Sequence, residues 1–178
     1  MENQKVKKLL SKMTEVDQDV IRKIQKEEKL QKNGILIDKK GLIEKTRRIN
    51  TKKLKNLIKT YGFPSISLVG LKGTRDAWLI AQHSDYDLKF QKRYLAMMKK
   101  LTKKKEVLLQ NLAYLTDRVR ESSGLPQIYG TQIGPYSLNK NLRFKPGYVT
   151  DPRKLDKRRK AMGLEPFAKY VKQCGMHP

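Results

Sequence analysis

The chain has 178 residues with 41 Lys and Arg against 17 Asp and Glu, which gives a formal charge of +24. This length suits one hydrophobic core, or one core with an appended helical arm. A single cysteine, Cys174, excludes an intramolecular disulfide framework and a cysteine-based zinc site. No run reaches the roughly 18 apolar residues of a membrane helix, and the N-terminus lacks the pattern of a cleaved secretory signal, so we expect a cytoplasmic protein.

Two long amphipathic helices are predicted in the first third of the chain. Residues 3–32 carry apolar side chains at three- and four-residue steps, which is the spacing of one helix face. Residues 39–60 repeat this pattern. We therefore predict an N-terminal helical arm over residues 1–60, followed by a compact helical domain over residues 61–178.

Shorter helices are predicted beyond a break at Gly62 and Pro64. Residues 74–82 are predicted to form a buried helix, because residues 77–81 are apolar on all sides. Asp87 is a candidate N-cap for the next helix, because its carboxylate can accept hydrogen bonds from the backbone N–H groups of a first turn. An apolar stripe predicts a further helix over residues 107–122.

The last third of the chain departs from the helical pattern. Residues 127–133 alternate and contain β-forming side chains, so a small β-hairpin is predicted near residues 127–148. Asp151-Pro152 and Glu165-Pro166 then each begin a short helix with a proline in its first turn. The predicted fold class is mainly α, within the α+β class: a compact helical domain with one small β-hairpin and an N-terminal amphipathic helical arm.

Two dense blocks of positive charge stand out, residues 99–105 and residues 153–160, although lysines are spread along the whole chain. One interpretation is contact with a polyanion, either nucleic acid or an acidic membrane surface. The alternative is a solvated lysine-rich surface, because neither block contains an aromatic residue and no zinc finger or RNA-binding signature is present. The candidate polyanion-binding residues are Lys99, Lys100, Lys103, Lys104, Lys105, Arg153, Arg158 and Arg159.

His83 follows the most hydrophobic predicted helix, with Asp85 two residues further along the chain. A nearby carboxylate can hold one imidazole nitrogen, so His83 is a candidate general acid or base and Asp85 a candidate catalytic partner. The alternative is a histidine that caps the last carbonyls of its helix. Gln82 is a candidate substrate contact beside it.

Two further polar groups carry candidate site residues. Asp117 and Arg118 lie on a predicted helix, where they could orient a base and bind an anionic group; the alternative is an ordinary ion pair on a solvated face. Tyr129, Thr131 and Gln132 offer uncharged hydrogen-bonding groups of the kind that contact substrates in pockets. The alternative for this segment is a hairpin strand with a bulge at its glycine.

Several motifs occur in a fixed order: AWLIAQHSD at residues 77–85, LAYLTDRV at residues 112–119 and PQIYGTQ at residues 126–132. Together with Arg158-Arg159 and GLEP at residues 163–166, they resemble the bacterial domain-of-unknown-function family 6624 over about residues 45–172. The resemblance supplies no activity. It implies one shared pattern that includes His83, Asp85, Asp117, Arg118, Tyr129, Thr131 and Gln132.

Three functions remain open from the sequence. The first is a His83-dependent hydrolase or transferase that acts on a small anionic substrate with a phosphate or acyl centre. It would need no cofactor or metal, although Asp85 and Asp87 could hold a hard ion. The second is binding of nucleic acid or another polyanion. The third is an effector or regulatory domain whose arm packs on a partner protein. No oligomeric state follows from the sequence.

Overall fold

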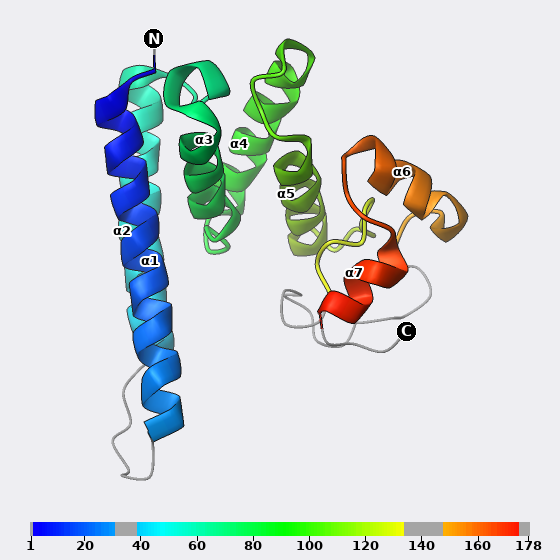
Figure 1. The fold of residues 1–178 in the computed structure, drawn as a ribbon, viewed down its shortest axis with the longest axis horizontal. Helices are drawn as coiled ribbons and strands as arrows, with labels where there is room; N and C mark the ends of the chain where they lie inside the picture. Colours follow the sequence, from blue (N-terminus) through cyan, green and yellow to red (C-terminus); the bar gives the residue numbers. More distant parts are fainter. Residues whose placement is uncertain (1, 31–38, 134–147, 175–178) are drawn as a thin grey trace. The chain divides into compact units, whose positions relative to one another are not determined.

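The computed structural model describes residues 2–30, 39–133 and 148–174. Within these ranges the fold is all-α, with seven α-helices, two short 3-10 segments and no β-strand (Figure 1). The chain divides into two compact units, Met1–Ser84 and Asp85–Pro178. The first unit therefore extends past the predicted arm and takes in the next helix. No helix in the described ranges is long and apolar enough to cross a membrane.

The first unit consists of α1 (Gln4–Leu30), α2 (Lys39–Tyr61) and α3 (Ile66–Gln82). Helices α1 and α2 lie side by side and antiparallel, and α3 packs against both (Figure 1). The core of the unit is formed by apolar side chains from all three helices, namely Val6, Leu10, Met13, Leu54, Val69, Ala77 and Ile80. The predicted long helices of the arm are confirmed, because their apolar stripes are buried against one another and against α3.

Helix α3 begins earlier in the chain than its predicted start at residue 74. The Ser65 side chain caps its first turn by accepting from Leu68 N, and Gly70 then breaks the helical geometry with φ 70° and ψ 174°. The positive φ with an extended ψ is a conformation that L side chains rarely adopt, so the backbone requires glycine here. The kink interrupts the apolar period, which is why the first part of α3 was not predicted.

The second unit contains α4 (Leu88–Leu101), α5 (Leu109–Ser122), α6 (Leu155–Ala161) and α7 (Phe167–Gln173). Two 3-10 segments, η1 (Thr102–Lys104) and η4 (Pro152–Lys154), precede α5 and α6. The predicted cap of α4 is confirmed, since Phe90 N donates to Asp87 Oδ1 at 2.9 Å. The buried core of this unit includes Phe90, Tyr94, Met98, Leu112, Leu115, Ile133, Tyr148, Tyr170 and Val171.

The predicted β-hairpin is wrong in the part of it that the structure describes. Residues 127–133 form no strand, and their single bridge, from Gln127 to Val149, is parallel rather than antiparallel. Residues 134–147 of the predicted hairpin lie outside the described residues. The backbone of residues 128–131 bonds to buried side chains instead of to another strand, as described below. The fold class is therefore all-α rather than α+β over the described ranges.

Candidate functional sites

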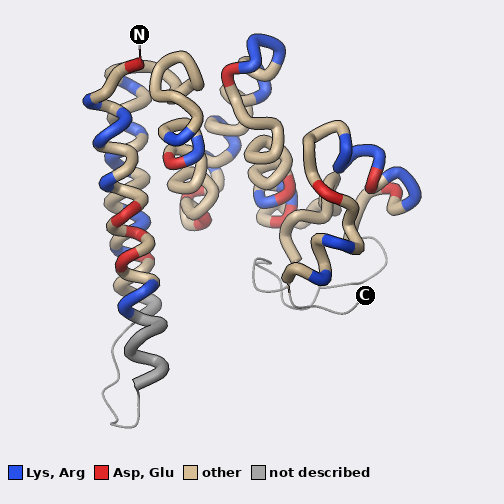
Figure 2. Tube along the Cα trace, viewed as in Figure 1, with Lys and Arg blue, Asp and Glu red and all other residues tan. Residues whose placement is uncertain are grey.

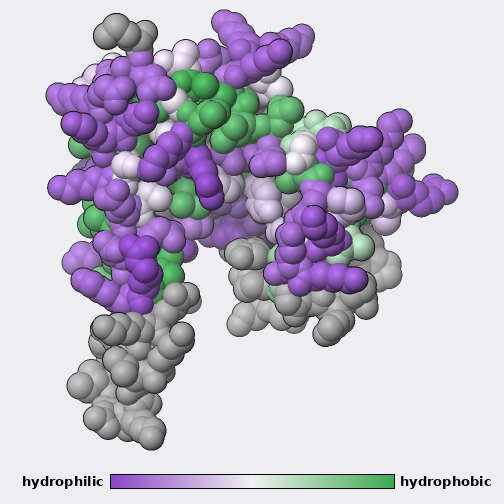
Figure 3. Space-filling view, in the orientation of Figure 1, coloured by the Kyte–Doolittle hydropathy of each residue, from purple (hydrophilic) through white to green (hydrophobic). Residues whose placement is uncertain are grey.

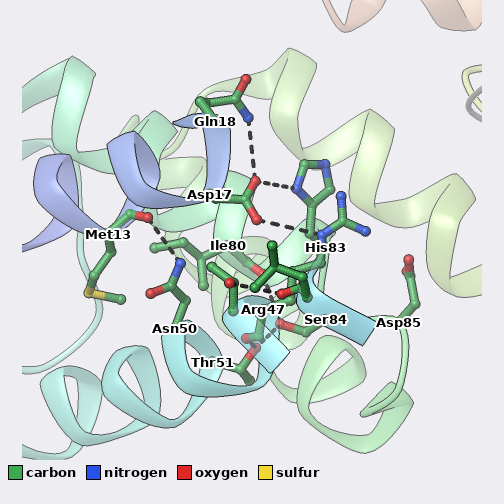
Figure 4. Close-up of polar contacts among 12 residues, drawn as sticks. Met13, Asp17, Gln18, Arg47, Asn50, Thr51, Ile80, His83, Ser84 and Asp85 are labelled. Carbon is green, nitrogen blue, oxygen red and sulfur yellow. Dashed lines mark hydrogen bonds and ion pairs between the residues drawn. The ribbon is translucent and has the colours of Figure 1, made fainter. Parts of the chain in front are cut away.

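His83 meets an acidic partner that the sequence did not indicate (Figure 4). Its Nδ1 lies 3.4 Å from Asp17 Oδ2 on α1, and Arg47 Nε on α2 lies 3.6 Å from Asp17 Oδ1. The Asp17 side chain is only 8% exposed. Burial acts to raise the pKa of Asp17, but the hydrogen bond and charge of His83, with the help of Arg47, hold it below its ordinary value. One carboxylate therefore links three helices.

The space beside His83 is too small for a substrate. The cavity has a volume of about 10 Å³, which holds about one water molecule at most. Polar contacts close it, because Asn50 Nδ2 on α2 donates to the carbonyl oxygen of Met13 on α1 at 3.0 Å. The geometry gives His83 a partner that fixes the packing of α1, α2 and α3. The general acid or base role of His83 stays a prediction.

A residue pattern could have revealed this cluster. On α1, the buried residues Val6, Leu10 and Met13 continue at a four-residue step to Asp17. An acidic residue on the buried stripe of a helix requires a partner, because an unpaired buried charge is costly. The partners could not be named, since Arg47 and His83 are distant from Asp17 in the sequence.

Three of the predicted site residues converge in the second unit. The Arg118 guanidinium donates to Asp85 through Nε at 2.8 Å and Nη2 at 2.5 Å, and to Gln132 Oε1 through Nη1 at 3.1 Å. Gln91 Nε2 donates to Asp85 Oδ1 at 3.2 Å. The side chains of Arg118 and Asp85 are 10% and 27% exposed. The planar guanidinium of an arginine matches a carboxylate in this bidentate geometry. The Arg118 guanidinium is therefore already occupied by Asp85, a carboxylate of the same protein.

Asp117 is adjacent to Arg118 in the chain, but its carboxylate contacts backbone N–H groups rather than this ion pair. It is fully buried, and its oxygens accept from the backbone N–H groups of Ile128 at 2.7 Å, Tyr129 at 3.1 Å and Thr131 at 2.9 Å. The Thr131 hydroxyl also donates to it at 3.0 Å. Burial raises the pKa of the Asp117 carboxyl, and these donors oppose that rise. Asp117 therefore anchors a loop, which we name the 128–131 loop.

Two arginines donate hydrogen bonds to backbone carbonyl oxygens of the same loop. Arg158 Nε donates to the carbonyl oxygen of Ile128 at 2.7 Å, and Arg159 Nη1 donates to that of Tyr129 at 2.6 Å. Arg159 is 1% exposed, and its guanidinium carbon lies 4.9 Å from the ring centre of Tyr170. Both guanidinium groups are thus bound to backbone of their own chain. We leave them out of any proposed polyanion-binding surface.

The remaining predicted contacts are mostly buried. Gln82, Thr131 and Gln132 are 6%, 0% and 1% exposed, and Gln82 belongs to the first unit while the other two belong to the second. Tyr129 is only partly buried. Burial raises the pKa of the Tyr129 hydroxyl, the Asp117 charge adds to this rise and Arg158 opposes it. Of these four residues, Tyr129 presents the most accessible polar side chain.

The predicted hard-ion alternative finds no support in the geometry. Both Asp85 oxygens accept from Arg118, and Asp87 Oδ1 caps α4. Over the described ranges, no group of three or more His, Cys, Asp or Glu side chains is arranged to hold a metal ion.

The first basic block, residues 99–105, covers the last turn of α4, the η1 segment that follows it and the C-cap of η1. We name this block the lysine tip. Its five lysines are exposed, and none forms an ion pair with a residue that the structure describes. Positive charge is concentrated at this turn (Figure 2), and hydrophilic side chains project from it (Figure 3). In the second block, Arg153 is exposed and lies 3.7 Å from Asp151. The lysine tip consists of Lys99, Lys100, Lys103, Lys104 and Lys105.

A protein-family model described as "Family of unknown function (DUF6624)" matches residues 4–175. The chain belongs to this family. The resemblance found in the sequence is confirmed, and the DUF6624 match covers nearly the whole chain. No curated protein and no solved structure matches the chain. Because DUF6624 membership assigns no activity, the function has to be argued from the geometry of the sites.

The DUF6624 motifs divide between the two units. His83 lies in the first unit, and Asp85, Asp117, Arg118, Tyr129, Thr131 and Gln132 lie in the second. In each unit a carboxylate pairs with an arginine of the same protein, as Asp17 does with Arg47 and Asp85 does with Arg118. The lysine tip differs from both clusters, because its charges are exposed and lack acidic partners among the described residues.

Proposed function

We propose that this protein binds the phosphate backbone of a nucleic acid through the lysine tip. Five ammonium groups occur within seven residues at the end of α4, in η1 and at its C-cap, and all five side chains are exposed. Lysine contacts phosphate as a flexible point charge, which suits the negatively charged edge of a duplex. The tip contains no arginine fork and no aromatic side chain, so we expect its lysines to contact mainly the phosphates. The proposed binding is therefore to the backbone and independent of sequence.

The observation that carries the proposal is the backbone of Lys105. Its φ is 57° and its ψ is 29°, which is the left-handed region that L side chains seldom adopt. After α2, α5 and α6 the chain uses glycine in this conformation, at Gly62, Gly124 and Gly163. A lysine at such a position costs about 1–2 kcal/mol relative to glycine. A non-glycine residue in this conformation marks a candidate functional position, and the exposed ammonium is the group that Lys105 presents there.

Helix stabilisation accounts for only part of the lysine tip. Lys99 and Lys100 lie in the last turn of α4, where positive charge interacts favourably with the helix dipole. That interaction falls off beyond the last turn. Lys103, Lys104 and Lys105 lie beyond the end of α4, so the dipole does not explain them.

The proposal does not extend to catalysis. A hydrolase or transferase centred on His83 needs a recess that admits a substrate, and the cavity beside His83 is about 10 Å³. The anion clamp expected of Arg118 is already filled by Asp85. The small-substrate hypothesis therefore gains no support from the geometry of either cluster.

The salt dependence of duplex binding tests the proposal. Each phosphate contact contributes about −0.9 to the slope of log affinity against log salt concentration. Changing Lys103, Lys104 and Lys105 together to Gln should reduce the magnitude of that slope by about 2.7, through the loss of three contacts. The measurement is fluorescence anisotropy of a labelled DNA or RNA duplex between low and physiological salt.

A charge-matched variant gives the control. Lys89, Lys92 and Arg93 are exposed on α4, so changing all three to Gln removes the same formal charge without touching the lysine tip. This variant should keep nearly the whole slope. Equal slopes for the two triple variants would mean that binding follows net charge alone, and the proposal would be wrong.

A further inference from the structure

We propose that a groove between α1 and α2 binds an acidic amphipathic helix of a partner protein. We name it the α1–α2 groove; its volume is about 610 Å³. Both helices contribute apolar side chains and one lysine each to its walls. The residues that the argument uses are Leu9, Lys12 and Val16 on α1, with Ile49, Lys53 and Leu57 on α2.

The groove is an apolar surface that the first unit does not cover with its own described residues. Leu9, Val16 and Ile49 are 41%, 44% and 46% exposed, although each is a large hydrophobic residue. Helix α3 packs on the α1–α2 pair through different residues, which include the fully buried Leu10 and Leu54. Helical bundles bury such grooves under another helix, whose side chains interlock with those of the two walls.

The dimensions of the groove suit a helix. The wall on α2 extends from Thr46 to Tyr61, which is about 22 Å at a rise of 1.5 Å per residue. A partner helix of about 15 residues matches that length. The apolar positions recur at helical spacing on both walls, which is the arrangement that receives the apolar face of an amphipathic helix.

Charge selects the kind of helix. Lys12 and Lys53 are the charged residues among those lining the groove, and no acidic residue lies among them. A helix with Asp or Glu beside its apolar face would place carboxylates near both ammonium groups. A second copy of the chain is a poor occupant, because it carries a formal charge of +24 and brings the same lysines. An acyl chain would leave lining polar groups such as Asn56 and Thr60 without partners.

The clusters described above fix the geometry of this groove. Asn50 lines it, and its amide bonds to the carbonyl oxygen of Met13 across the two helices. The contacts of Asp17 with Arg47 and His83 tie the same helices together beside it. A groove whose walls are held at a fixed spacing needs less ordering when a ligand binds.

The test uses two synthetic peptides of about 15 residues. Both carry Leu along one helical face, and the polar face is Glu in one peptide and Lys in the other. The Glu peptide should bind and shift the amide NMR resonances of α1 and α2, whereas the Lys peptide should not. Changing both Val16 and Ile49 to Asp should weaken binding of the Glu peptide at least about tenfold, since two buried aliphatic contacts are lost.

Matched variants separate the groove from general effects. Leu71→Asp changes a residue of α3 that is 60% exposed and outside the groove, so it should leave the affinity unchanged. Changing Lys12 and Lys53 to Gln should weaken binding several-fold, whereas the same change at the exposed Lys8 and Lys52 should have little effect. The lysine pair tests the groove even if the double Asp variant unfolds.

Four results would overturn the proposal. The first is equal binding of the Glu and Lys peptides, and the second is equal loss of affinity in the groove variants and their controls. The third is a concentration-dependent dimer that the Val16 and Ile49 changes abolish, which would identify a second copy as the occupant. The fourth is displacement of the Glu peptide by oleate at equal concentration, which would identify an acyl chain.

Discussion

Single carboxylates in this protein contact side chains from other helices. Asp17 contacts His83 and Arg47, and Asp85 forms an ion pair with Arg118. The contacts of Asp17 join α1 to α2 and to the end of α3. The Asp85–Arg118 pair joins the segment before α4 to α5. A buried carboxylate is stable only while its partners remain, because desolvation otherwise disfavours its charge. Both clusters are therefore sensitive to substitution.

The Asp17 cluster predicts a loss of stability in acid. The pKa of Asp17 lies below its ordinary value in the folded state, so its contribution is present above the unfolded-state pKa and is lost as pH falls through the folded one. We expect Asp17→Asn to lower the free energy of unfolding at pH 7 by about 1–3 kcal/mol and to weaken its pH dependence below about pH 4. Urea denaturation at several pH values measures both.

The control is Asp19→Asn, which neutralises a side chain that is 55% exposed on the same helix. It should change stability by less than about 0.5 kcal/mol. If the two variants followed the same pH dependence, the lowered pKa of Asp17 would not be the cause of the acid sensitivity.

At the scale of elements, the 128–131 loop shows how buried side chains can replace a sheet. Asp117 accepts from its N–H groups, while Arg158 and Arg159 donate to its carbonyl oxygens. The Tyr170 hydroxyl donates to the carbonyl oxygen of Thr131 at 2.7 Å. These bonds satisfy the backbone polar groups that a strand would pair with a neighbour. The loop is therefore fixed without a β-partner.

Substitutions in this loop anchor should differ in cost. Asp117→Asn places an amide donor among N–H donors, so we expect a loss of about 2–3 kcal/mol in the free energy of unfolding. Tyr170→Phe removes one hydroxyl and keeps the ring, so we expect about 1 kcal/mol. Chemical denaturation of both variants checks the order. A smaller loss for Asp117→Asn than for Tyr170→Phe would contradict the anchoring role.

The sequence predicted those elements whose residues are periodic. The apolar stripes located α1, α2, α4 and α5, and Asp87 gave the start of α4. The first part of α3 was missed because Gly70 interrupts the period, and the hairpin was wrong because alternation in residues 127–133 reflects loop anchoring. Of the seven residues that the resemblance placed in one pattern, Arg118 contacts both Asp85 and Gln132, whereas His83 contacts Asp17. Asp17 and Arg47 were missed, because pairing across helices cannot be seen in local spacing.

At the scale of the whole molecule, each unit has a surface for which we propose a partner, because its own described residues neither cover nor neutralise it. The first has the apolar α1–α2 groove, and the second has the lysine tip. A formal charge of +24 attracts polyanions to the entire chain, so a specific surface must be distinguished from general attraction. Charge-matched variants make that distinction, because each removes the same number of positive charges from a different part of the protein.

The substitution Lys105→Gly tests the central claim most directly. Glycine adopts the left-handed backbone without strain, so the variant should gain about 1 kcal/mol in the free energy of unfolding. It should also bind a nucleic-acid duplex more weakly, with a salt slope smaller in magnitude by about 0.9. Thermal unfolding and duplex titration on the same sample measure the two quantities. A more stable variant with unchanged duplex affinity and salt slope would contradict the account, because the lysine charge would then have no role in binding.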